Sequence, residues 1–435
     1  MISDPSLSSV LSTEARLLLL TAGGKSNDAS IATVLRGSEE MDWGKMSWLT
    51  DWERGTGVVW RRLQSVAPSA IPEDHALSWE RLAMVADFHS LYLQERFLEI
   101  VRALVDAGVE VILLKGAALA FSAYGGFKER PMGDVDILVE PAQAQLAWDV
   151  ATSLGWSWDR NAYPEVSYRG HHHLPPLTDT RGVGAKLELH TALSVFGHPF
   201  ALGYDAVRRS SRGLRVADRD VQALDDNHQV VHLGVHLAWS HMLSFGAWRT
   251  FRDLNAVVGA GRVDWDTVAQ AARTHGASSC CYWTLRLARS LSGIDVPSAA
   301  LDLLKVPTPR SMRGIVERHL ATQLFATERV CPSESVRRTL WSAAIRPGRL
   351  RLGEGRPWDI DAVTAPSAGQ PVSYSRRVGN QVESMAQWLH YLSLVLLPRR
   401  EKGSRRAGPQ SEHNDGGSSP TETSTDIHEP ADRSG

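Results

Sequence analysis

The sequence predicts an α+β protein, and three observations support this prediction. Between residues 79 and 154, segments with helical and with strand-like spacing of apolar residues alternate. Beyond residue 220 the apolar patterns are helical. The last 35 residues, from Glu401, are mostly Ser, Thr, Gly, Pro and charged residues with one large aliphatic, Ile427, too few apolar groups to offset chain entropy. We therefore expect a sheet with flanking helices, a helical C-terminal domain and a disordered tail.

The overall composition narrows the class of protein further. With 47 basic and 49 acidic side chains in 435 residues, the chain is nearly neutral, so we expect no stable nucleic-acid partner. The three cysteines, Cys280, Cys281 and Cys331, form no CxxC site and fit a reducing, cytoplasmic location. No stretch reaches the roughly 18 to 20 apolar residues of a membrane span. Residues 388–397 could lie on a membrane surface, but a C-terminal helix packed on the body is the preferred interpretation.

The first half of the α+β unit begins with a long amphipathic helix. Apolar residues recur at three- and four-residue spacing from Trp79 to Ala107, and Gly108 stands where a helix would end. The continuous apolar run Val109–Leu114 then predicts a strand buried on both faces. After Lys115-Gly116, a short helix is expected over Ala117–Tyr124. The predicted order is helix, strand, helix.

The next strand carries two aspartates. In MGDVDILVE (132–140), Asp134 and Asp136 are two residues apart, so an extended chain places them on one face. Two carboxylates about 4 Å apart repel by roughly 4 kcal/mol at an effective dielectric of about 20, unless a cation lies between them. Oxygen ligands favour Mg²⁺ or Mn²⁺ over zinc. The strand is therefore a candidate metal site.

A third carboxylate follows on a later strand. Pro141 is expected to open a helix over Ala142–Leu154, and two strands are expected near residues 165–174 and 184–190. In the second, Glu188 and His190 share one face. On an adjacent strand, Glu188 would complete a site for two Mg²⁺ ions about 3.5 to 4 Å apart. The helices expected beyond this strand are Asp226–Met242, Ala247–Val258, Asp264–Ala272 and Ser278–Leu291.

With these motifs the sequence resembles the DNA polymerase β-like nucleotidyltransferase superfamily, and within it the group of uncharacterised nucleotidyltransferases. The resemblance spans roughly residues 80 to 300. It is carried by LLKGAAL (113–119), ERPMGDVDILV (129–139), HHHLPPL (171–177), LELH (187–190), VHLGVHL (231–237) and FRDL (251–254). It implies a polymerase β-like mixed sheet. We expect a helical region over 1–78, a catalytic domain over 79–220, a helical acceptor-side domain over 221–400 and the tail over 401–435.

The resemblance also implies roles for the acidic residues. Asp134 and Asp136 would bind both metal ions, and Glu188 would complete one metal site and could act as the base. His190, on the face of Glu188, could contact the acceptor or a phosphate. The implied reaction is Mg²⁺- or Mn²⁺-dependent transfer of a nucleoside monophosphate from an NTP, with ATP as the expected donor. The acceptor is expected to be a small molecule, peptide or protein rather than RNA.

The basic and glycine residues are assigned to the triphosphate. Lys115 and Arg130 are the expected cations, and Gly116 opens a helix whose free amides can receive phosphate. Ala117 stands where the wider superfamily has Gly or Ser, so one hydroxyl contact is missing. This departure keeps open a non-catalytic nucleotide-binding or interaction module. A DxD glycosyltransferase is a second alternative, which leaves Lys115-Gly116 and Glu188 unexplained.

Other polar residues are weaker candidates. The run His171–His173 is assigned a structural or substrate-facing role in preference to a zinc site. His232 and His236 are spaced i, i+4 on a helix, but no third metal ligand is evident. Arg252 and Asp253 are expected to form a salt bridge between the helical domain and the catalytic unit.

Overall fold

The structure is a computed structural model that describes most of the chain as far as Leu397. The described residues are 7, 9–37, 41–164, 168, 171–182, 184–194, 200, 203–304, 306, 308–325, 329–346 and 374–397. The tail expected to be disordered, 401–435, lies outside them. So do five positions of the strand expected over 165–174.

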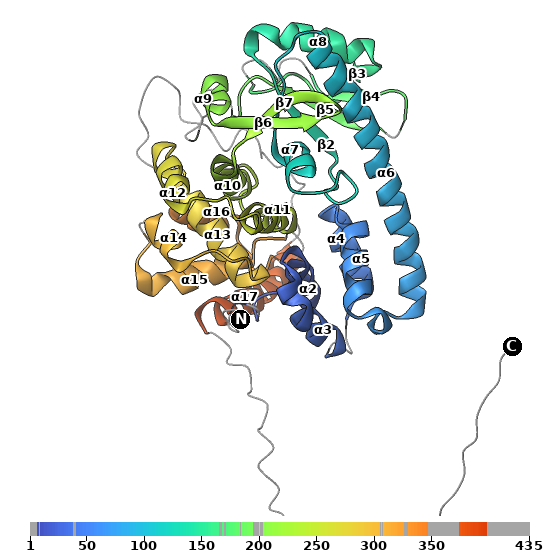
Figure 1. The fold of residues 1–435 in the computed structure, drawn as a ribbon. Coiled ribbons are helices and arrows are strands. Elements are labelled where there is room, and N and C mark those ends of the chain that lie inside the picture. The colour runs from blue at the N-terminus through green and yellow to red at the C-terminus, as the bar shows by residue number, and fades with distance from the viewer. Residues whose placement is uncertain are drawn as a thin grey trace, which may run out of the picture. The chain divides into compact units, whose positions relative to one another are not determined.

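A seven-stranded mixed sheet forms one part of the fold, as predicted (Figure 1). Its strands, in spatial order, are β3 (Trp156–Trp158), β4 (Leu177–Asp179), β5 (Lys186–His190), β2 (Asp134–Leu138), β1 (Ile112–Leu113), β7 (Arg219–Leu224) and β6 (Ser211–Val216). Strand β2 pairs antiparallel with β1 and parallel with β5, and β1 pairs parallel with β7. The carboxylate strands β2 and β5 are therefore neighbours near the centre of the sheet.

Two parts of the sheet differ from the expectation. Of the residues that the structure describes within 165–174, His173 makes an isolated bridge to His190, and the next strand is β4. The β6–β7 hairpin was not predicted. Its turn residues Ala217 and Asp218 have φ of +55° and +60°, a geometry usually signalled by Asn-Gly or Asp-Gly. A turn without glycine between partly polar strands leaves little local signal.

Helices flank the sheet and form the rest of the described fold (Figure 1). Before and within the sheet they are α2 (Thr13–Ala22), α3 (Asp28–Arg36), α4 (Trp43–Trp52), α5 (Thr56–Val66), α6 (Glu73–Asp106), α7 (Lys115–Ser122), α8 (Ala144–Ser153) and α9 (Tyr204–Arg209). After the sheet they are α10 (Asp226–Val235), α11 (Ala247–Gly259), α12 (Trp265–Thr274), α13 (Ser278–Ser292), α14 (Ser298–Leu303), α15 (Arg310–Ala321), α16 (Glu334–Ala344) and α17 (Tyr374–Leu396). A π-helical turn, His236–Ser240, follows α10 and replaces the end of the longer helix expected there.

Two hydrophobic cores organise these elements. One lies between the sheet and α6, α7 and α8, and includes Phe97 and Ile137. The other core joins the N-terminal helices α2 to α5 with helices after residue 226. A hydrogen bond crosses the same contact, from the Trp248 indole N–H to Thr21 Oγ1 over 2.9 Å. Helix α6 enters both cores, since Trp79 belongs to the second. The N-terminal helices thus pack with the later helices, and position 78 falls inside α6.

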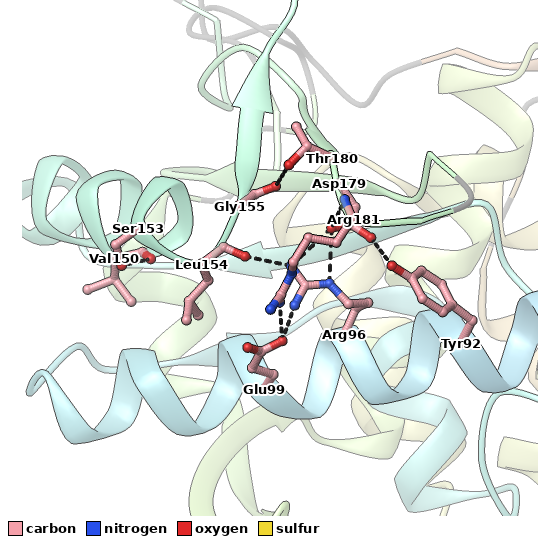
Figure 2. A network of polar contacts seen from close by, with 10 residues as sticks. All are labelled: Tyr92, Arg96, Glu99, Val150, Ser153, Leu154, Gly155, Asp179, Thr180 and Arg181. Carbon is pink, nitrogen blue, oxygen red and sulfur yellow. Dashed lines mark hydrogen bonds and ion pairs between the residues drawn. The ribbon is translucent and has the colours of Figure 1, made fainter.

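Polar contacts attach α6 to β4, the strand next to the β3 edge of the sheet (Figure 2). Arg96 donates from Nε to Asp179 Oδ1 over 3.1 Å, and from the terminal nitrogen Nη2 to the Leu154 carbonyl over 2.8 Å. The Tyr92 hydroxyl donates a hydrogen bond to the same aspartate. The Glu99 carboxylate accepts hydrogen bonds from both Arg96 and Arg181. The Arg96 and Asp179 side chains are nearly buried, so this network holds α6 against β4.

The C-terminal helix α17 packs on the body of the protein, as preferred from the sequence. Tyr391 and Val395 are buried, and Arg318 of α15 donates to the Val395 carbonyl over 2.7 Å. Among the helices that the structure describes, none combines the length and the apolar character needed to cross a bilayer.

Candidate active site

The acidic residues meet where β2 and β5 run side by side. In the parallel register, Asp136 lies opposite Glu188, and Leu138 lies opposite His190. The alternate residues Ile137 and Leu187 are fully buried in the core behind them. The period of two places the acidic side chains together on the other face. The expectation that Glu188 lies on a strand adjacent to the aspartates is therefore confirmed.

Asp136 is held between Lys115 and His190. Lys115 Nζ lies 3.0 Å and His190 Nε2 lies 2.8 Å from the same oxygen, Asp136 Oδ1. His190 Nε2 is also 3.5 Å from Glu188 Oε2. Burial alone would raise the pKa of Asp136, but Lys115 and His190 hold it well below its ordinary value. Lys115 and His190 thus both stabilise the ionised form of the Asp136 carboxylate.

The donor set fits a divalent cation. Asp136, Glu188 and His190 each offer one ligand atom, and these atoms lie within 4.8 Å of one another. His190 is 2% exposed, and its Nδ1 has no hydrogen-bond partner in the described part of the chain. Asp134 lies two residues before Asp136 and lines a neighbouring cavity. Carboxylates alone suit Mg²⁺, whereas an imidazole in the set shifts preference toward Mn²⁺ or another transition ion.

The cavity beside the acids has a volume of about 190 Å³ and is lined from both cores. Lys115 and Gly116, at the start of α7, and Asp134 and Asp136, on β2, line it from one side. Residues of α10, α11 and the segment between them line it from the other side, including Leu233, His236, Phe245, Arg249, Thr250 and Asp253. Arg54 contributes from the turn after α4. Ligand pockets commonly measure 300–1,000 Å³, so this volume suits part of a nucleotide rather than all of it.

Arg130 occupies a position different from the one expected of a phosphate ligand. Its guanidinium donates to both carboxylate oxygens of Asp253, over 2.6 and 2.7 Å, and to the Pro131 carbonyl over 2.7 Å. It also lies against Gly116, where an added Cβ would be 3.2 Å from the guanidinium carbon. Arg130 therefore links the segment before β2 to α11. Asp253 of α11 thus makes a salt bridge to the segment before β2, as expected, while Arg252 donates to the Glu129 carbonyl and makes no ion pair in the described part of the chain.

Two arginines that were not identified from the sequence face the cavity. Arg54 lies against Gly133, beside Asp134, and makes no ion pair with any residue that the structure describes. Arg249 lies over the Phe245 ring, 4.6 Å from its centroid, and only 4.0 Å from Glu53, which accepts the Gly246 N–H. Arg249 precedes Asp253 by four residues, so helical spacing could have placed it on the same face. Arg54 carries no comparable sequence signal.

Four histidines gather beside Glu188. The rings of His171, His172 and His173 have centroids 4.2 to 4.8 Å apart, and His190 lies 5.0 Å from His173. Burial lowers the pKa of His172 to about 2 and of His171 to about 4, so both rings are neutral at neutral pH. Neutral imidazoles can accept a hydrogen bond or bind a metal, and His171–His173 also place ligand atoms within 4.8 Å of one another.

The fold and the site together define a class of protein: an α+β fold with carboxylates on adjacent central strands beside a cavity lined by basic and acidic side chains. The model of a family described as uncharacterised nucleotidyltransferases matches residues 39–293, which is more than half of the chain. The protein belongs to this family, as the sequence motifs suggested. No curated protein and no solved structure matches the chain.

Proposed function

We propose that the protein transfers a nucleoside monophosphate from an NTP, with ATP as the expected donor, to an acceptor hydroxyl or similar nucleophile. The acceptor oxygen bonds to the α-phosphorus, the bond from that phosphorus to the bridging oxygen breaks, and pyrophosphate leaves. One observation carries the proposal: Asp136 faces Glu188 across paired strands beside a cavity lined by cations. Membership of a nucleotidyltransferase family supports the reaction class.

The carboxylates have two proposed roles, metal binding and proton abstraction. Asp134, Asp136 and Glu188 would hold Mg²⁺ or Mn²⁺, which when bound neutralises phosphate charge and orients the reacting oxygens. The Glu188 side chain is 21% exposed, so an acceptor can reach it, and it is the proposed base for the acceptor proton. His190 holds Asp136 and Glu188 in place by bonding to the former and lying close to the latter.

The triphosphate contacts are revised from the sequence assignment. Because Arg130 forms an ion pair with Asp253, we assign Arg54 and Arg249, together with Lys115, to the phosphates. These three cations line the same cavity as Asp134 and Asp136. Charge-assisted contacts of this kind fix phosphate position, which is the main catalytic requirement of phosphoryl transfer.

Label transfer tests the proposal directly. Wild-type protein is incubated with α-³²P-labelled NTPs, Mg²⁺ or Mn²⁺ and cell extract, and labelled products are identified by mass spectrometry. Asp136→Asn should abolish transfer, whereas Asp220→Asn, on the exposed end of β7, should leave it unchanged. Equal transfer by wild type and Asp136→Asn would overturn the proposal.

A non-catalytic nucleotide-binding module is the second candidate. It is favoured by Lys115 and His190, which already neutralise Asp136, and by the buried Ala117 in place of a hydroxyl or glycine. In that case NTP with Mg²⁺ would raise the melting temperature while no pyrophosphate appears with any NTP or acceptor extract. Pyrophosphate release that depends on Asp136 would exclude this candidate.

A further inference from the structure

One face of α6 is apolar although it is exposed. Five large apolar side chains share this face, which we call the α6 stripe: Leu77, Met84, Val85, Phe88 and Leu91, each 48% to 68% exposed. At about 100° per residue, all five lie within roughly 60° of Phe88 around the helix. The opposite face carries Trp79 and Phe97, which are buried. Helix α6 therefore presents apolar surface on two sides, only one of which is covered within the described chain.

Charged residues continue the line of the stripe at both ends. Asp74, Arg81, Phe88, Glu95 and Arg102 follow one another at intervals of seven residues, and all five are exposed. Their charges read minus and plus before Phe88, then minus and plus after it. In the described part of the chain Arg81, Glu95 and Arg102 have no ion-pair partner, and Asp74 has only His75, at 3.8 Å. Every position is therefore open to a partner of opposite sign.

We infer that two copies of the protein pair through the α6 stripe, antiparallel, about a two-fold axis at Phe88. Positions equally distant from Phe88 then face each other, so Arg81 meets Glu95 of the second copy and Asp74 meets Arg102 of the second copy. Symmetry repeats both contacts, giving four complementary ion pairs. A parallel in-register arrangement would instead place like charges together. The order of charges thus favours a second copy of the protein as the partner and an antiparallel orientation of the two helices.

The geometry and area fit such a dimer. Positions seven residues apart drift by about 20° per step around a straight α-helix, and a left-handed crossing of the two helices keeps such positions facing each other. With roughly 100 Å² exposed per side chain, the two stripes would remove about 1,000 Å² from water, near the lower limit for a specific interface. The flanking charges have both signs, which suits a second copy better than an anionic lipid surface.

Sedimentation equilibrium of the full chain tests the inference without reference to its activity. Wild type should dimerise in the micromolar range or tighter. Phe88→Asp should weaken dimerisation more than a hundredfold, while Leu82→Asp should not change it, because Leu82 is 47% exposed on the same helix but points about 120° away from Phe88. A monomeric wild type at 100 μM, or equal effects of the two variants, would overturn the inference.

Charge reversal tests the antiparallel register. Arg81→Glu and Glu95→Arg should each weaken the dimer about tenfold at low salt, because each places two like-charge pairs at the interface. The double variant should restore wild-type affinity. If both single variants leave dimerisation unchanged, or if the double variant is weaker than either, the antiparallel pairing at Phe88 is wrong. Unchanged circular dichroism and melting temperature check that each variant is folded.

Discussion

Arg130 and Asp253 form a two-pronged ion pair across 123 residues of sequence, with Nε and one terminal nitrogen of the guanidinium 2.6 and 2.7 Å from the two carboxylate oxygens. Both residues are buried, and Tyr124 donates its hydroxyl to the same aspartate over 3.2 Å. The pair joins the segment leading into β2 to helix α11. The two walls of the cavity are thereby connected beside the carboxylates.

Removing one partner of this pair should destabilise the protein strongly. Asp253→Ala leaves the Arg130 guanidinium buried without its counter-charge, at an expected cost of about 3 to 5 kcal/mol in unfolding free energy. Urea unfolding measures this change. The double variant Arg130→Met, Asp253→Leu should recover much of the loss, since it removes the buried charge as well. A loss below about 1 kcal/mol for Asp253→Ala would contradict this role.

Loss of a cavity arginine should weaken phosphate binding. Arg54→Ala and Arg249→Ala are each expected to lower the affinity for a non-hydrolysable NTP, and for inorganic tripolyphosphate, by about tenfold, which corresponds to about 1.4 kcal/mol. Isothermal titration calorimetry measures both ligands. Arg215→Ala, in the exposed β6–β7 hairpin, is the control and should bind as wild type does. Affinities unchanged in both cavity variants would refute the assignment of Arg54 and Arg249.

A substitution at Gly133 should lower phosphate affinity by displacing the Arg54 side chain. A Cβ at position 133 would lie 2.2 Å from the Arg54 guanidinium carbon, so Gly133→Ala must displace that side chain. Because the obstacle is the end of a flexible side chain, stability should change little, while tripolyphosphate affinity should fall toward that of Arg54→Ala. In the Arg54→Ala background the same glycine change should have no further effect. Additive losses in a double-mutant cycle would show that Gly133 acts by another route.

His319 should contribute to the loss of stability in acid. Burial lowers its pKa from 6.5 to about 4, and its Nδ1 lies 2.9 Å from the Tyr391 hydroxyl between α15 and α17. The unfolded chain takes up a proton at this residue below pH 6.5 and the folded chain does not, so stability falls as the pH drops from 6.5 toward 4. This residue alone should account for a few kcal/mol, on the order of 3, at pH 4.

The variant His319→Gln measures how much protonation of His319 contributes to the loss of stability in acid. Wild type should lose more unfolding free energy than the variant between pH 6.5 and 4, and the two curves should run parallel above pH 7. Chemical denaturation at a series of pH values supplies both curves. Identical slopes across the acidic range would show that His319 is already protonated in the folded protein or makes no pH-dependent contribution.

The elements with strong local periodicity were predictable from the sequence. The apolar run before Lys115 and the alternation in β2 and β5 predicted the central strands. Helix α6 was predicted over most of its length. Helix α6 begins six residues earlier than expected, at Glu73, because its first residues are mostly polar and none of residues 73–78 is buried. The β6–β7 hairpin was missed because its turn residues, Ala217 and Asp218, lack the usual glycine signal.

The sequence by itself determined the α+β class and the shared face of Asp134 and Asp136, because both follow from the repeat of side-chain direction along one segment. The sequence also suggested Lys115 as a nearby cation, but only the tertiary structure decided which basic side chains lie beside the aspartates. Lys115 and His190 meet at Asp136, Arg130 is taken by Asp253, and Arg54 enters the cavity from a turn about 80 residues away in sequence. Such partners depend on how separate segments pack, and local periodicity carries no information about contacts between distant segments.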